Sequence, residues 1–190
     1  MTEGVDTWMR LAGLLPPAQA EEFKDCWAIG EQEAGLGLLV SGILSNEVAI
    51  SETVRAQLSV LAETWGGREA LAPRIRHCRG DGQPASAVTL IEQDDALVSG
   101  ETVQADRSLA GLVLVPWIGC RRCGEALMRV HIREDWGGLS YLAEHYAITT
   151  PARTAVVRLF PTDAADKAFI SLLQACGQSS TSTDSTGVTP

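Results

Sequence analysis

The feature that most constrains this chain is a change in its hydrophobic pattern near residue 80. Before that point, apolar residues recur every three or four positions, which is typical of helices that bury one face. After it, they form short runs or alternate with polar residues, as in strands. The turn-rich stretch Arg79–Pro84 separates the two patterns. We therefore predict an α+β protein, with a helical module over residues 1–79 and an α+β module over residues 80–177.

Local start and stop signals divide the first module into helices. Pro16-Pro17 ends the first helix and begins the second, because proline suits the first turn of a helix. Ser51 is a strong N-cap for the clearest helix, and Gly66-Gly67 ends it. The predicted helices cover residues 5–15, 17–29, 33–45, 52–65 and 68–75. Together they predict an N-terminal helical bundle.

The helix predicted over residues 33–45 combines an apolar stripe with three glycines. The stripe consists of Leu36, Leu39, Val40, Ile43 and Leu44. The glycines are Gly35, Gly37 and Gly42, and each weakens a helix by up to ~1 kcal/mol relative to alanine. We therefore expect this helix to depend on tertiary support or to use glycine for close packing.

The second module is predicted to be a mainly antiparallel sheet followed by a C-terminal helix. Its strands are predicted over residues 87–91, 102–105, 112–115, 127–133 and 154–160. The run over 112–115 is continuously apolar, so we expect it to be central. Asp163 is expected to cap the last helix, whose buried stripe is Ala168, Phe169, Leu172, Leu173 and Cys176. The Ser- and Thr-rich tail over residues 178–190 is expected to be disordered.

The chain has five tryptophans. Trp8, Trp27 and Trp65 lie on apolar helix faces, so we expect them in the core. Trp117 and Trp136 flank a pair of cysteines. We expect both in the core as well, with an exposed binding anchor as the alternative for one of them.

The chain is acidic, with a formal net charge of -9 and a pI of about 4.8. This charge repels phosphate backbones and anionic lipids, so we expect binding neither to nucleic acid nor to membranes. A basic protein partner would be attracted to it, although acidity also serves solubility alone.

The sequence pattern predicts a cytoplasmic location. The N-terminus is acidic, unlike that of a secretory signal, and the apolar stretches Leu36–Leu44 and Leu109–Ile118 are shorter than the ~20 residues of a membrane-spanning helix. The five cysteines are odd in number and irregularly spaced, unlike those of a secreted disulfide framework. A reducing compartment fits them better.

Residues 11–66 carry an ordered set of helical features. A short helix ends in an apolar pair and proline, a second helix follows, Gly-Glu opens an apolar helix, and an Ile-Ser step leads into a last helix. The features are Leu14-Leu15-Pro16, Phe23 to Ile29, Gly30-Glu31, Leu36-Leu38-Leu39, Ile43-Leu44, Ile50-Ser51, Leu58, Leu61, Ala62 and Gly66. In this order they resemble the small helical MafI-type immunity proteins of bacterial toxin systems, although any antiparallel helical bundle would share much of the pattern.

The resemblance implies a protein that binds and neutralises a cognate toxin by occlusion inside the producing cell. An acidic inhibitor suits a basic toxin, because it copies the charge of a nucleic-acid substrate. The alternative is an accessory or assembly protein of a larger bacterial complex. A zinc- or thiol-dependent enzyme is a more distant alternative. The sequence predicts neither the oligomeric state nor the interface residues.

The sharpest local motif is Cys120-Arg121-Arg122-Cys123-Gly124, which lies between two predicted strands. Two cysteines at this spacing followed by glycine are typical of a zinc knuckle. A structural zinc site needs four ligands. The candidate metal ligands are Cys120, Cys123 and Cys78, with His77, His131 and His145 as further candidates. The alternative is a reduced pair of thiols on a hairpin, with no cofactor.

No catalytic residue is predicted. A thiol nucleophile would need Cys120 and His131 within hydrogen-bond reach, and nothing in the sequence brings them together. Asp94-Asp95 and Glu134-Asp135 fit turn or surface positions, because neighbours on a strand point to opposite faces. The sequence contains no phosphate-binding glycine loop, serine-nucleophile elbow or His-Glu-x-x-His motif. It therefore favours a non-catalytic binding protein.

Overall fold

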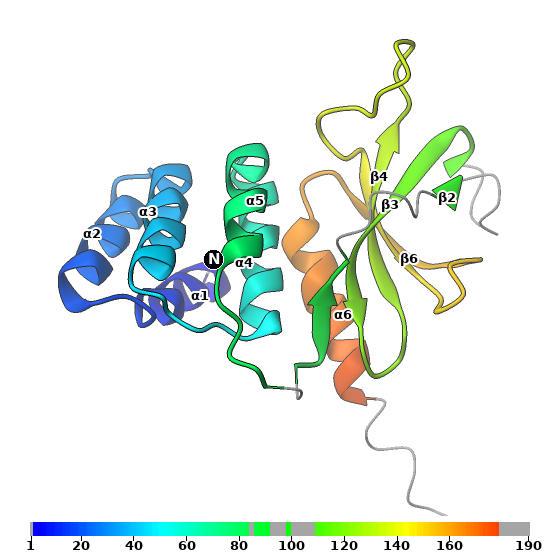
Figure 1. Ribbon diagram of the computed structural model, residues 1–190. Coiled ribbons are helices and arrows are strands. Elements are labelled where there is room, and N and C mark those ends of the chain that lie inside the picture. The colour runs from blue at the N-terminus through cyan, green and yellow to red at the C-terminus, as the bar shows by residue number, and fades with distance from the viewer. Residues whose placement is uncertain (1, 84–85, 92–97, 100–108, 179–190) are drawn as a thin grey trace, which may run out of the picture. The chain divides into compact units, whose positions relative to one another are not determined.

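The computed structural model describes residues 2–83, 86–91, 98–99 and 109–178. The chain divides into two compact units, Met1–Ala85 and Ser86–Pro190, so the division falls six residues after the predicted boundary. The first unit is helical, and the second combines a sheet with the last helix of the chain (Figure 1). The predicted α+β class is confirmed.

Five helices are present in the described residues of the first unit, as predicted, although the first ends at Ala12 and not at residue 15. They are α1 (Thr2–Ala12), α2 (Pro17–Ala28), α3 (Gln32–Ser45), α4 (Glu52–Thr64) and α5 (Arg68–His77). The Ser51 hydroxyl caps α4 by accepting a hydrogen bond from the Val54 amide at 3.2 Å. Gly66 follows α4 with a φ of +77°, a conformation that strains any residue with a side chain.

The core of the helical unit forms around the Trp8 ring. This ring stacks on Phe23 with the ring centroids 4.0 Å apart, and its indole N–H donates to the Phe23 carbonyl at 3.0 Å. A Cβ on Gly35 would lie 2.7 Å from Trp8 and 2.8 Å from the Cys26 Cβ, and a Cβ on Gly42 would overlap Leu15. Close packing through glycine is therefore confirmed at Gly35 and Gly42. It does not apply to Gly37, where a Cβ would meet nothing within 4 Å.

The buried Arg55 side chain closes the C-terminal end of α5. Its guanidinium donates to the carbonyls of Ile75 at 2.6 Å, Arg76 at 3.2 Å and Cys78 at 2.8 Å. It also pairs with Glu52 at 2.9 Å. The last carbonyls of a helix lack partners inside the helix and carry partial negative charge, so a buried cation is stabilised there. Arg55 therefore has a structural role.

The second unit is built on an antiparallel sheet. Its strands are β1 (Val88–Leu90), β2 (Val98–Ser99), β3 (Leu112–Cys120), β4 (Ala126–Ile132), β5 (His145–Thr149) and β6 (Val156–Pro161). The strand order is β1-β3-β4-β5-β6, with β2 also paired to β3, so the predicted central strand is confirmed. The sequence did not predict β2 or β5. The strand predicted over residues 102–105, and residues 179–190 of the predicted tail, lie outside the described residues.

The helix α6 (Ala165–Gln178) packs on one face of the sheet, as Figure 1 shows. Arg158 of β6 donates to the backbone carbonyl of Ser171 in α6, so Arg158 lies on the helix side of the sheet. Strand neighbours alternate between faces, and a buried apolar cluster occupies the opposite face. This cluster contains Leu109, Leu114, Ala126, Met128, Val130 and Ala147. No helix among the described residues is both long and apolar enough to span a membrane.

The five tryptophans occupy different environments. Trp8 and Trp117 are buried, as predicted, and Trp27 and Trp65 are half-buried. Trp136 is 77% exposed, so its assignment to the core is wrong and the alternative of an exposed position holds. The reason is local: Trp136 lies in the hairpin loop between β4 and β5, where the described residues leave its ring largely exposed.

Candidate functional site

The connection between β4 and β5, residues 133–144, is an ordered loop held by its own hydrogen bonds. The Glu134 amide donates to the Gly138 carbonyl at 2.9 Å, and the Gly137 amide donates to the Glu134 carbonyl at 2.8 Å. Gly137 has a φ of +89°, which this tight turn requires. The loop therefore presents its side chains from a fixed backbone.

The base of this loop is fastened to β4. The buried His131 ring places Nδ1 2.9 Å from the Ser140 carbonyl oxygen. The Ser140 hydroxyl donates to the Leu142 carbonyl at 2.8 Å and accepts from the Ile132 amide at 3.1 Å. His131 therefore helps to hold the base of the loop in place.

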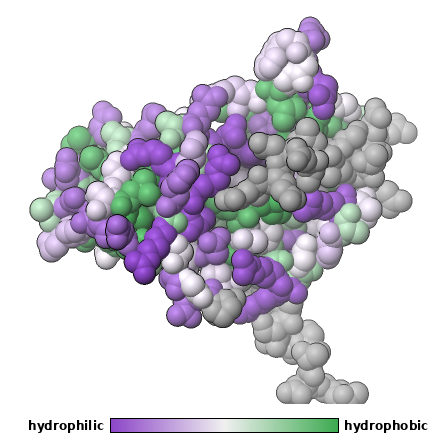
Figure 2. Space-filling model, viewed as in Figure 1, coloured by the Kyte–Doolittle hydropathy of each residue, from purple (hydrophilic) through white to green (hydrophobic). Residues whose placement is uncertain are grey.

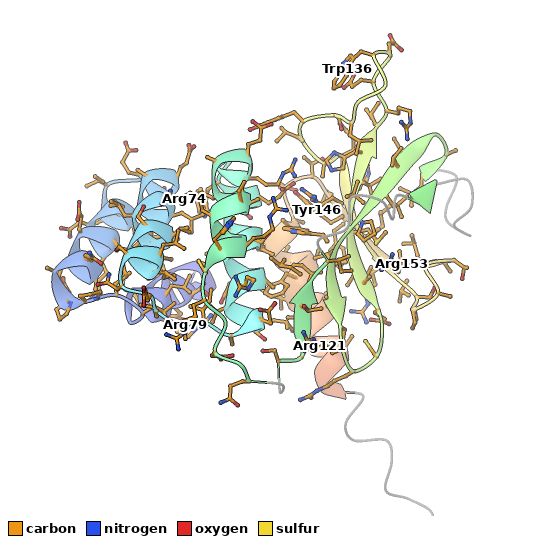
Figure 3. The ribbon with its side chains drawn as sticks, in the orientation of Figure 1. Arg74, Arg79, Arg121, Trp136, Tyr146 and Arg153 are labelled. Carbon is orange, nitrogen blue, oxygen red and sulfur yellow. The ribbon has the colours of Figure 1, made fainter. Side chains whose placement is uncertain are left out.

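Four large apolar side chains are exposed on and beside this loop. Trp136 is 77% exposed, Tyr141 and Leu142 are each 57% exposed, and Ile132 is 42% exposed. Figure 3 shows Trp136 at the far end of the loop, beyond the ends of the strands. Figure 2 shows hydrophobic, green atoms at the base of the same projection. Tryptophan and tyrosine are the residue types that most often anchor protein–protein interfaces, so we call these four side chains the aromatic loop surface.

The tip of the aromatic loop surface is shaped by a glycine. A Cβ on Gly138 would overlap the Trp136 indole, so this ring lies directly against the Gly138 backbone. The absence of a side chain at Gly138 thereby fixes where the ring rests. An aromatic anchor that is positioned before binding loses less conformational entropy when a partner docks.

Charged groups around the aromatic loop surface are mainly acidic. Glu134, Asp135 and Glu144 provide three carboxylates, and Arg133 provides one cation. Asp135 and Arg133 are exposed, and the other two are half-buried. The predicted turn or surface position of Glu134 and Asp135 is confirmed. An apolar centre with an acidic rim suits a partner with an apolar pocket and a basic rim.

The helical unit has an acidic surface of its own around the turn between α2 and α3. Its exposed carboxylates are Glu21, Glu22, Asp25, Glu31 and Glu33. Burial and then the charges of Glu22, Glu31 and Asp25 raise the pKa of the Cys26 thiol above its ordinary value. Ile29 is 72% exposed in the same turn. The exposed carboxylates here add to those around the aromatic loop surface, and one of them, Glu21, is paired with Lys24 at 2.8 Å.

The three cysteines predicted as metal ligands are divided between the two units. Cys120 and Cys123 flank the turn between β3 and β4, while Cys78 follows α5 in the other unit. Cys120 is disulfide-bonded, so the expected reduced pair is wrong at Cys120, because the tertiary fold supplies this sulfur with a partner. Burial raises the pKa of the Cys78 thiol, which opposes formation of a metal-binding thiolate.

The candidate histidines lie at other places in the fold. His131 pairs across the ladder with Val113, seven residues before Cys120, which places the two side chains about 23 Å apart along the strand. His145 pairs with Val130 at the same end of the sheet, and His77 belongs to α5. Among the described residues no group of three or more His, Cys, Asp or Glu side chains could hold a metal ion. A Cys120–His131 pair is therefore incompatible with the strand register, and zinc binding stays a prediction.

Sequence reasoning missed most of the aromatic loop surface. It named Trp136 as one of two possible anchors, but not Tyr141, Leu142 or Ile132. The available signal was Leu139–Leu142, a stretch with three large apolar residues directly after the Trp136-Gly137-Gly138 turn. Many buried strands also begin with a turn followed by apolar residues. This pattern alone therefore does not distinguish exposed apolar residues from buried ones.

Comparisons with protein-family models, curated proteins and solved structures find no match to this chain. The resemblance of residues 11–66 to MafI-type immunity proteins therefore stays a prediction.

Proposed function

We propose that this protein is a non-catalytic binding protein that docks a protein partner on the aromatic loop surface. The observation that carries this proposal is the 77% exposure of Trp136 on a loop whose backbone is fixed by hydrogen bonds. Leaving a large indole in water has no benefit for folding, because burial of such a ring is strongly favourable. Docking of a partner would supply that burial.

The partner we propose is basic. The carboxylates of Glu134, Asp135 and Glu144 surround the aromatic anchor, and the whole chain has a net charge of -9. Complementary charge raises the association rate and selects among partners. In its specific form the proposal is an immunity protein that occludes a basic toxin, which the resemblance of the helical unit also supports. An accessory role in a larger complex would use the same surface with a different basic partner.

The experiment is affinity capture with the full-length chain from its native organism. Three baits are compared: wild type, Trp136→Ala, and Val157→Ala as a matched control. Val157 is an exposed apolar residue on β6, outside the aromatic loop surface. We expect a basic protein in the eluates of wild type and Val157→Ala, strongly reduced in that of Trp136→Ala. A partner captured equally by all three baits would contradict the proposed surface.

Co-expression then tests whether the protein is an immunity protein. If the captured protein is a toxin, it should arrest growth when expressed alone and be tolerated when the wild-type chain is present. Trp136→Ala should protect less well than Val157→Ala. A captured protein that is harmless alone would favour the accessory role instead.

A further inference from the structure

The turn between β3 and β4 brings a disulfide-bonded cysteine and a free thiol together. Cys120 ends β3 and is disulfide-bonded, whereas Cys123 is a half-buried free thiol three residues later. The Cys120 amide donates to the Glu125 carbonyl at 2.8 Å, and the Gly124 amide donates to the Cys120 carbonyl at 3.1 Å. These bonds close the turn, so the spacing between the two cysteines is fixed by the hairpin.

The backbone of this turn wraps around the Cys120 sulfur. The amides of Arg122 and Cys123 each lie 3.4 Å from Cys120 Sγ as hydrogen-bond donors. These two contacts hold the Cys123 backbone beside the Cys120 sulfur. A Cys-x-x-Cys turn of this kind suits a disulfide between its own two cysteines.

Gly124 makes the turn possible at this position. Its φ is +76°, and a Cβ there would lie 3.0 Å from the Pro151 side chain. Arg121 and Arg122 are exposed on the same turn, and Glu125 is half-buried beside them. Cys123 is itself half-buried, so its thiol is partly accessible to solvent.

We infer that the Cys120–Cys123 turn is a thiol–disulfide exchange site. The Cys123 thiol loses its proton to water, and its thiolate attacks Cys120 Sγ. The bond between Cys120 and its present partner breaks as the Cys120–Cys123 bond forms. The partner sulfur leaves as a thiolate and takes a proton from water. One disulfide replaces another, so the step needs no external oxidant or reductant.

The other free cysteines do not share this arrangement. Cys26 and Cys78 belong to the helical unit, and burial raises the pKa of both thiols. In a reducing compartment, disulfides that form are usually transient and redox-sensing. The exchange would release the end of β3 from its covalent link without unfolding the hairpin, and it is independent of the proposed docking surface.

The test maps disulfides in the full-length protein, purified without reductant and equilibrated with graded ratios of reduced to oxidised glutathione. The reaction is quenched with acid, free thiols are blocked with N-ethylmaleimide, and the unreduced protein is digested with trypsin. Trypsin cleaves after Arg121 and Arg122, so a Cys120–Cys123 bond appears in mass spectrometry as two peptides joined by a disulfide. Cys123→Ser removes the attacking thiol, and Cys26→Ser is the matched control.

The expected result is that wild type and Cys26→Ser show a Cys120–Cys123 disulfide at intermediate ratios, with the number of disulfides per chain unchanged. Cys123→Ser should retain the original Cys120 disulfide under the same conditions. The inference is overturned if Cys120 opens to a free thiol at the same glutathione ratio in wild type and Cys123→Ser, with no Cys120–Cys123 product. It is also overturned if Cys120 is already a free thiol in protein purified without reductant.

Discussion

At the scale of single residues, two glycines of the same helix are expected to respond to substitution in opposite directions. A Cβ at Gly35 would press on Trp8 and Cys26, so Gly35→Ala should lower the free energy of unfolding by ~1–3 kcal/mol. Gly37 faces open space, so Gly37→Ala should raise it by up to ~1 kcal/mol. Urea denaturation followed by circular dichroism measures both. Equal effects of the two substitutions would contradict the packing around Trp8.

Arg55 is expected to be costly to replace because three carbonyls depend on its guanidinium. Arg55→Met keeps the volume but leaves the carbonyls of Ile75, Arg76 and Cys78 without this donor, and should cost about 3 kcal/mol of stability. Arg10→Met is the control, because Arg10 makes an exposed bond to Gln57, and should cost less than ~0.5 kcal/mol. Thermal and urea unfolding provide the comparison. If Arg55→Met lowers the free energy of unfolding by less than ~1 kcal/mol, the capping role is refuted.

The Cys26 thiol reports the potential of the acidic α2–α3 surface. Negative neighbours disfavour a thiolate, so the double substitution Glu22→Gln and Glu31→Gln should lower the Cys26 pKa toward its ordinary value. At neutral pH the thiolate fraction then rises, and alkylation by iodoacetamide becomes faster. Added salt should act in the same direction in wild type through screening. Burial is the larger cause of the raised pKa. If the alkylation rate does not change in the double variant, burial alone raises the Cys26 pKa.

At the scale of elements, Gly138 is expected to position the Trp136 ring on its loop. Gly138→Ala places a Cβ where the indole lies, so the ring must move while the backbone stays within ordinary angles. In an amide-proton NMR spectrum, we expect one tryptophan indole signal to shift and the other four to stay unchanged. Trp136→Phe identifies that signal. If the Trp136 signal stays in place in Gly138→Ala, the ring does not rest on the turn.

Elements with local signals were predictable from sequence, and those defined by distant partners were not. Ser51 and Pro17 mark helix starts by their own chemistry, so α2 and α4 were found close to their observed bounds. β5 is buried at four of its five positions, which removes the alternation that marks a half-exposed strand. Its pairing with β4 and β6 defines it as a strand.

The same distinction holds for the candidate site. The Cys120–Gly124 turn was located correctly because cysteine spacing and glycine are local features. The disulfide at Cys120 could not be predicted, because its partner is set by tertiary structure. The exposure of Trp136 is also set by tertiary structure, so it could not be predicted from local sequence.

At the scale of the whole molecule, the chain combines a net charge of -9 with the aromatic loop surface. Charge acts over about 8 Å at physiological ionic strength and guides encounter, whereas the desolvated anchor determines how long a complex lasts. In the proposed function, the acidic carboxylates would attract a basic partner, and Trp136 would set the lifetime of the complex. Loss of Trp136 should be felt mainly in the dissociation rate.

The most direct test is the dissociation constant of the captured partner, measured by titration calorimetry with full-length wild type, Trp136→Ala and Val157→Ala. Burial of the indole at the centre of an interface predicts that Trp136→Ala weakens binding at least ~10-fold, which corresponds to about 1.4 kcal/mol. Val157→Ala should bind like wild type. Equal dissociation constants for wild type and Trp136→Ala would show that the aromatic loop surface is not where this protein binds.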